Sequence, residues 1–168
     1  MIKKLTLALI VMTAIIILGA SRKTAASTSI GKEKIRIGAL LCLSGSCAEW
    51  GTNGLQGLRM AIAELNGKGG VNGKDLELVV EDSSEEIPTK SVAAFERLRT
   101  DKSIQFIIGP TWTPAAKAIA PLAATSKELL MISPSVGIRD FSESSENLFN
   151  LWPADDIATK IMHLQKRA

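Results

Sequence analysis

The chain has 168 residues, of which 46% are hydrophobic and 22% are charged. This is enough apolar material for one core of ordinary size, so we expect one domain or part of a larger one. The net charge of +3 is small and comes partly from clusters at the two ends, so a groove for nucleic acid is not indicated. The chain has only two cysteines and one histidine. A closed zinc site needs four such ligands, so we do not expect one.

Residues 1–26 have the order of a secretory signal. Two lysines precede an apolar run, and small residues follow it. The run is shorter than the roughly 20 residues that cross a bilayer, so we expect export, with cleavage after Ala20 or Ala26. Residues 27–33 then form a spacer, and the mature chain is periplasmic or extracellular. An N-terminal anchor that is not cleaved is the alternative.

A near-continuous apolar strand over residues 35–41 comes next, of the kind that is covered on both faces of a sheet. From Gly51 the period changes to steps of three and four residues, which predicts a helix. The glycines of "NGKGG" end this helix, because glycine readily adopts the left-handed cap conformation. The apolar stripe of the helix consists of Leu55, Leu58, Ile62 and Leu65.

The rest of the chain alternates strands with helices. We expect strands at residues 76–82, 104–109, 129–133 and 147–153, helices at residues 87–101 and 113–127, a loop over residues 134–146, and a last helix from residue 154. Pro121 falls inside the second of these helices and should bend it, because it leaves the carbonyl of Lys117 without a helical donor.

This alternation predicts an α/β fold, a doubly wound parallel sheet with right-handed crossovers. In such sheets a ligand sits at the carboxyl ends of the strands. The candidate site therefore lies in the loops after the first, third and fourth strands, at residues 44–51, 110–114 and 134–139.

Three glycines open the first helix and raise the question of a nucleotide site. Gly51, Gly54 and Gly57 follow a strand, and Asp82 ends the next strand, as in dinucleotide-binding units. The spacing is G-x-x-G-x-x-G, however, and the dinucleotide fingerprint is G-x-G-x-x-G. We therefore favour close packing of the helix on the sheet over pyrophosphate binding.

Cys42 and Cys47 are five positions apart at the end of the first strand. In an oxidising compartment they could form a disulfide if their Cα atoms approach within about 6–7 Å. A buried free Cys42 with an exposed Cys47 is an equally acceptable interpretation.

Four motifs in this order, "LSG…WG", "NGKGGVNGK", "IIGP" and "ISPS", resemble the leucine/isoleucine/valine-binding proteins, the type I periplasmic solute-binding receptors of ABC transporters. The likeness runs from about Ile35 to Asp156. It implies a Rossmann-like lobe that holds a small solute against a second lobe. Residues 34–153 would form the N-terminal lobe, and residues 154–168 would start a helix leading toward a second lobe, before which the sequence is truncated.

The resemblance also implies roles for individual residues. Trp50 matches a bulky aromatic residue beside the ligand's apolar side chain. Thr113 matches the residue whose hydroxyl and neighbouring N–H groups hold the ligand carboxylate. Ser135 falls where a backbone carbonyl receives the ligand ammonium. Gly137 falls where amino-acid binders offer a threonine hydroxyl to the same group, and this departure argues against an α-amino ligand.

Each of these positions has a structural alternative. Trp50 could fill the face between lobes or the core, although its place in a turn favours a cleft. Thr113 could be only the N-cap of its helix.

The function that the resemblance implies is that of an extracytoplasmic solute-binding protein of an ABC importer. Its partners would be an amino acid or similar small polar solute and a membrane permease, with no cofactor and no metal. We do not expect an enzyme, because His163 is far along the chain from every strand-end loop and no G-x-S-x-G elbow exists. The alternatives are a ligand-sensing receptor domain of the same fold and, less favoured, an exported nucleotide-binding enzyme.

Overall fold

A computed structural model describes residues 33–84 and 87–165. The expected signal segment, residues 1–26, and the spacer except for Glu33 lie outside these ranges. Among the described residues, no helix is both long enough and apolar enough to cross a membrane.

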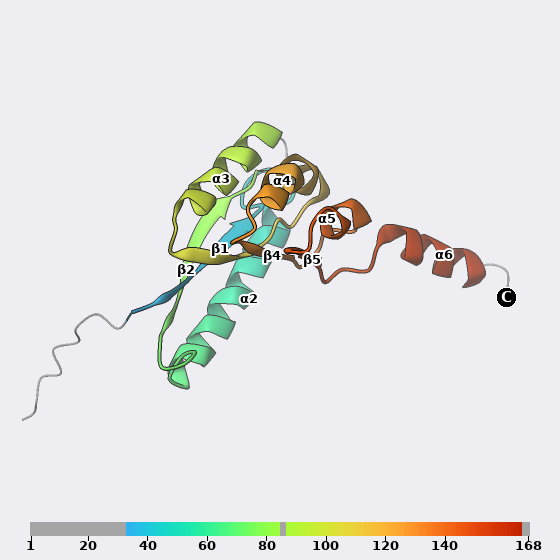
Figure 1. Ribbon diagram of the computed structural model, residues 1–168. Coiled ribbons are helices and arrows are strands. Elements are labelled where there is room, and N and C mark those ends of the chain that lie inside the picture. The colour runs from blue at the N-terminus through green and yellow to red at the C-terminus, as the bar shows by residue number, and fades with distance from the viewer. Residues whose placement is uncertain (1–32, 85–86, 166–168) are drawn as a thin grey trace, which may run out of the picture. The chain divides into compact units, whose positions relative to one another are not determined.

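Five parallel strands form one sheet in the order β2-β1-β3-β4-β5 (Figure 1). The strands are β1 (Ile35–Leu41), β2 (Leu76–Asp82), β3 (Ile104–Ile108), β4 (Leu130–Ser133) and β5 (Leu148–Asn150). The predicted doubly wound parallel sheet is confirmed. Because β1, β3 and β4 are neighbours and run in the same direction, the loops that follow them share one edge of the sheet.

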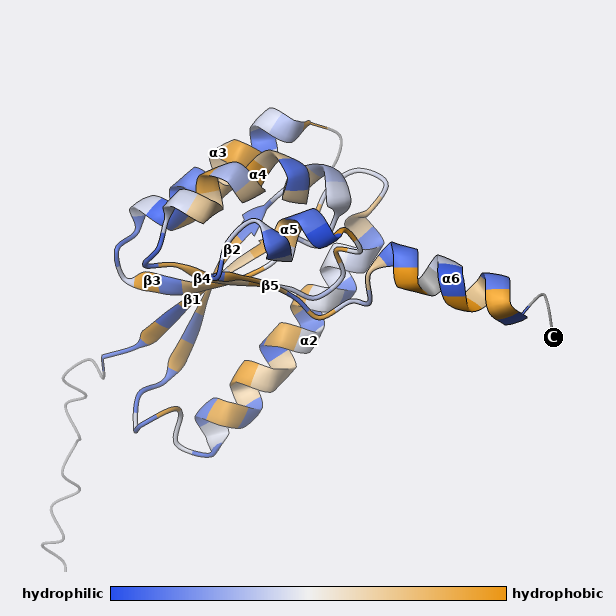
Figure 2. Cartoon of the chain, turned by 45° about the vertical axis from the view of Figure 1, so that its right-hand side comes forward, coloured by the Kyte–Doolittle hydropathy of each residue, from blue (hydrophilic) through white to orange (hydrophobic). Residues whose placement is uncertain are grey.

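Helices cover both faces of this sheet. They are α2 (Ala48–Gly67), α3 (Pro88–Thr100), α4 (Thr113–Thr125) and α5 (Arg139–Glu143), whereas α6 (Asp155–Gln165) extends away from the sheet (Figure 1). Helix α2 packs on β1 and β2 from one face, and α3 and α4 pack together over the other face (Figure 2).

The core is unequal on the two faces. The larger cluster lies under α3, α4 and α5 and includes Phe95, Leu98, Ile107, Ile119, Met131 and Phe141. The cluster under α2 is small and has Ala39, Leu41 and Leu55 as its buried members. The predicted stripe of α2 is therefore buried only near the start of the helix, and Leu65 near the end of the helix is 42% exposed.

Most boundaries differ from the expected ones by one or two residues, and three differences are larger or change an element. Helix α2 starts at Ala48, before Gly51. The segment expected to be a loop, residues 134–146, contains the short helix α5, which is held by the fully buried Phe141. The last strand ends at Asn150, where the Asn150 side chain donates a hydrogen bond to the Ile138 carbonyl at 2.8 Å.

The three glycines of α2 do not act as one packing face. A methyl group on Gly51 would overlap the carbonyl group of Cys42, so the close-packing prediction is right at this position. Gly54 and Gly57 are exposed, and nothing lies where their side chains would be. The packing prediction is wrong for these two positions.

Candidate functional site

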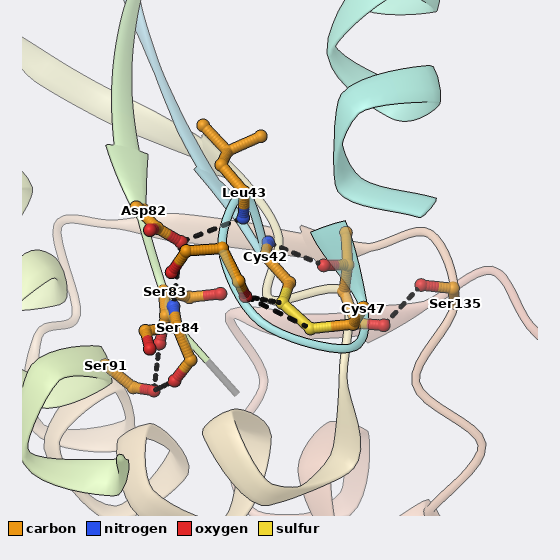
Figure 3. Close-up of a disulfide and its surroundings, with 10 residues drawn as sticks. Cys42, Leu43, Cys47, Asp82, Ser83, Ser84, Ser91 and Ser135 are labelled. Carbon is orange, nitrogen blue, oxygen red and sulfur yellow. Dashed lines mark hydrogen bonds between the residues drawn. A yellow bond between two sulfur atoms is a disulfide. The ribbon is translucent and has the colours of Figure 1, made fainter. Parts of the chain in front are cut away.

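Three loops meet at the carboxyl edge of the sheet, and we call them together the rim. They are residues 42–47 after β1, residues 109–112 after β3 and residues 134–138 after β4. The buried Thr111 links all three, because its Oγ1 accepts a hydrogen bond from the Cys42 N–H at 3.1 Å. Its carbonyl accepts a second hydrogen bond, from the Ser135 hydroxyl at 2.7 Å (Figure 3). The sequence analysis included Thr111 in the candidate loop 110–114 but assigned it no role.

A second set of contacts fixes the loops after β3 and β4. The buried Ser133 hydroxyl donates to the Pro110 carbonyl at 2.8 Å and accepts from the Val136 N–H at 3.0 Å. The N–H of Gly109 donates to the Ile132 carbonyl at 2.9 Å. Gly109 has φ of +126°, and a side chain there would overlap the Leu40 carbonyl, so only glycine fits.

Cys42 and Cys47 are joined by a disulfide within the first rim loop, with their Cα atoms 5.9 Å apart (Figure 3). Cys47 is 1% exposed, so the alternative with an exposed Cys47 is wrong. The bridge closes the turn that leads from β1 into α2.

Asp82 attaches the same loop to the end of β2. Its Oδ1 accepts hydrogen bonds from the N–H groups of Leu43, at 2.8 Å, and Ser84, at 2.9 Å. Burial opposes the charged form of this carboxyl group, but hydrogen bonds from Ser44, Leu43 and Ser84 outweigh burial and lower the pKa of Asp82. The carboxylate is thus engaged in holding two strand ends together.

The residues that the family resemblance singled out lie on this edge in two groups. Trp50 is in the first turn of α2, is 66% exposed, and lines a hollow of about 330 Å³ with Glu49 and Asn53. Neither Thr113 nor Ser135 lines that hollow. Thr113 is the first residue of α4, and the N-cap position is occupied by Trp112, with no side-chain cap hydrogen bond. The N-cap alternative for Thr113 is therefore wrong.

Ser135 and Gly137 lie in the third rim loop, which Thr111 connects to the start of α4. The carbonyl of Gly137 accepts a hydrogen bond from the Asp155 N–H at 2.9 Å, so the start of α6 also joins the rim.

A second hollow of about 270 Å³ lies where α4, the third rim loop and α6 meet. Its lining consists of Lys117, Gly137, Ile138, Arg139, Asp140, Asp155 and Asp156. Arg139 donates to both carboxylate oxygens of Asp156, at 3.0 and 3.2 Å. The hydrogen bond from Arg139 lowers the pKa of Asp156 and outweighs the opposing effect of burial.

No group of three or more histidine, cysteine or acidic side chains within residues 33–84 and 87–165 is arranged to hold a metal ion. The rim presents hydroxyl groups and backbone N–H groups, and charged side chains surround the second hollow.

A family model described as periplasmic binding protein matches residues 34–162. Over 109 residues the chain is 29% identical to the Leu/Ile/Val-binding protein BraC3 of Rhizobium johnstonii, which covers 65% of this chain and 29% of that protein. The chain spans less than a third of the length of the curated relatives it matches.

The chain is similar to many solved structures, of which two are described here. One is the branched-chain amino acid transporter substrate binding protein LivJ of Streptococcus pneumoniae in complex with isoleucine, with a TM-score of 0.67 and 28% identity, covering 73% of this chain and 35% of that chain. The other is an R. palustris solute binding protein in complex with 4-hydroxybenzoate, with a TM-score of 0.64 and 27% identity, covering 73% and 32%.

Proposed function

The chain belongs to the periplasmic binding protein family, and from this premise we propose that it is a solute-binding lobe of an extracytoplasmic receptor that serves an ABC importer. The observation that carries the proposal is the linkage through Thr111, which brings the start of α4 and the loop of Ser135 and Gly137 to one edge of the sheet. A solute held at this edge would meet donors and acceptors from several loops at once.

The solute we propose is small and carries a carboxylate. The amino end of α4 presents backbone N–H groups and the positive end of a helix dipole, and Thr113 adds a hydroxyl. The two similar structures described above each hold a compound with a carboxylate, isoleucine in one and 4-hydroxybenzoate in the other. Trp50 offers an exposed aromatic surface for the apolar part of the solute.

The partner and the location follow from the same role. We propose that residues 1–26 direct export and that the loaded receptor delivers its solute to a membrane permease. A ligand-sensing receptor domain would use the same rim and would differ in the partner that follows it.

Calorimetry with leucine, isoleucine, valine and 4-hydroxybenzoate tests the proposal. One lobe leaves the solute facing water on one side, so we expect saturable heat with a dissociation constant on the order of 1 mM. A submicromolar constant would contradict the one-lobe account. Conversion of any of the four compounds into a product would show an enzyme instead.

The matched variants are Thr113→Ala and Thr89→Ala, because both residues lie at the start of a helix and only Thr113 lies beside the rim. A hydrogen bond to a charged group contributes about 1.5–3 kcal/mol. We expect Thr113→Ala to abolish measurable heat and Thr89→Ala to leave it unchanged. Equal binding by both variants would remove Thr113 from the site.

A further inference from the structure

Part of the sheet face that carries α2 is left without a helix. Register partners in neighbouring parallel strands point to the same face of a sheet. One such row crosses β1, β3, β4 and β5 and consists of Ala39, Ile108, Ile132 and Phe149. Helix α2 packs on β1 and β2 and buries Ala39 at one end of the row. Phe149 at the other end is 45% exposed.

We call the uncovered part the bare sheet face. Its members are apolar and adjacent by register: Phe106, Ile108, Leu130, Ile132 and Phe149. The larger core lies on the opposite side of the same strands and does not bury them. Phe106 is 46% exposed, and the isoleucines and Leu130 are only partly buried. A contiguous apolar face of this kind marks an interaction surface.

Helix α6 carries a second apolar surface without cover, which we call the α6 stripe: Ile157, Ile161 and Leu164. The helix extends away from the sheet (Figure 1). Its start is fixed by the hydrogen bond from the Asp155 N–H to the Gly137 carbonyl and by the pairing of Arg139 with Asp156. Turning α6 back onto its own bare sheet face would break these contacts.

We propose that the bare sheet face of one copy of this chain binds the α6 stripe of a second copy, and that the exchange is mutual. The two surfaces match in size. An 11-residue helix is about 16 Å long, and three strands are together about 14 Å wide. A twofold pair makes the contact twice and leaves neither surface free to recruit a third copy.

The area that this pairing buries is enough for a weak dimer. With roughly 100–200 Å² for each large apolar side chain, the exposed fractions of both surfaces amount to about 400 Å² for one contact and about 800 Å² for two. Apolar atoms form about 65% of the surface in homodimer interfaces, so the total is about 1,200 Å². This lies at the lower end of the range for specific interfaces, and we expect a dissociation constant on the order of 10 µM.

Analytical ultracentrifugation of the purified chain over a concentration series tests the proposal. We expect an equilibrium between monomer and dimer. Phe149→Glu on the bare sheet face and Ile161→Glu on the α6 stripe should each weaken it by about tenfold or more. Thr89→Glu on α3 and Gln165→Glu on α6 add the same charge away from both surfaces and should leave it unchanged. Circular dichroism checks that each variant is folded.

An equimolar mixture of Phe149→Glu and Ile161→Glu shows which surface meets which. In a mixed pair the intact α6 stripe of the first variant can bind the intact bare sheet face of the second, so one of the two contacts is restored. We expect the mixture to associate more tightly than either variant alone.

The same series decides against the proposal in two ways. A chain that stays monomeric at every concentration would show that a second copy does not cover the bare sheet face. Association that survives Phe149→Glu, or a mixture no tighter than its components, would show that helix does not pair with sheet. No solute is added, so the outcome does not depend on the proposed function.

Discussion

Asp82 is a single side chain that joins two strand ends, because its carboxylate accepts N–H groups from Leu43 and Ser84. Hydrogen bonds to a charged group are worth about 1.5–3 kcal/mol each, less where water has access. We expect Asp82→Ala to lower the free energy of unfolding by about 2 kcal/mol in urea denaturation. Glu81→Ala is the control, since it removes only an exposed ion pair with Arg97 and should cost under about 1 kcal/mol.

The contribution of the Asp82 carboxylate to the free energy of unfolding should depend on pH. Its pKa is lower in the folded chain than the value of about 3.9 expected in the unfolded chain. The stabilisation is therefore complete well above this value and is lost as the pH falls through the folded pKa. The difference between the unaltered chain and Asp82→Ala should shrink from about pH 5 downward. A difference that grows in acid would contradict the assignment.

Gly51 and Gly54 form a natural pair for testing the start of α2. A methyl group on Gly51 would overlap the Cys42 carbonyl, whereas one on Gly54 would meet open space. We expect Gly51→Ala to destabilise the chain by about 1–3 kcal/mol through overpacking. Gly54→Ala should stabilise it by up to about 1 kcal/mol, because alanine is the better helix former. Thermal denaturation of both variants measures this, and equal effects would refute the packing role of Gly51.

The disulfide between Cys42 and Cys47 lies in the loop between β1 and α2. It closes a short loop, and the chain-entropy model gives such a loop roughly 2 kcal/mol of stabilisation. We expect a reductant to lower the stability of the unaltered chain by this amount and to leave the double variant Cys42→Ala, Cys47→Ala unaffected. Mass spectrometry after alkylation gives a direct check: label taken up by the denatured chain without reductant would mean free thiols.

At the scale of elements, α6 is the one whose apolar side chains lack cover among the described residues. Ile157, Ile161 and Leu164 recur at helical spacing, and all three are exposed, Ile161 by 52% and Leu164 by 67%. Figure 2 shows hydrophobic and hydrophilic positions alternating along α6. Exposed apolar stripes of this kind promote association.

We expect the chain to self-associate as its concentration rises and Ile161→Glu to keep it monomeric. Gln165→Glu is the matched control, because it adds the same charge on α6 and removes no apolar group. Analytical ultracentrifugation distinguishes the two. If Ile161→Glu and the unaltered chain sediment alike at every concentration, the stripe does not drive association.

The longer elements could be predicted from the sequence because their patterns are local. The apolar run over residues 35–41 predicts a strand, and the structure has a strand there. In α3, Phe95 and Leu98 lie on the buried face of the helix. Helix α5 and the end of β5 could not be predicted in this way. Helix α5 depends on burying Phe141, and β5 ends where Asn150 reaches the Ile138 carbonyl, and both are tertiary contacts.

At the scale of the whole molecule, the order of motifs predicted the family and the alternation of strands and helices predicted the parallel sheet, and both are confirmed. The detail of the rim could not be predicted. Thr111 reaches Cys42 across 69 positions of sequence, and Asp155 lies 18 positions from the glycine whose space it fills. Contacts of this range leave no periodic signal, so a sequence shows the loops that meet but not the side chains that join them.

The most direct test of the account is to locate solute binding residue by residue. Leucine is titrated into the ¹⁵N-labelled chain, and the backbone N–H signals are followed by NMR. The account predicts saturable shifts at Thr113, Ser135 and Gly137. Shifts confined to the glycines of α2, with none at the rim, would contradict it.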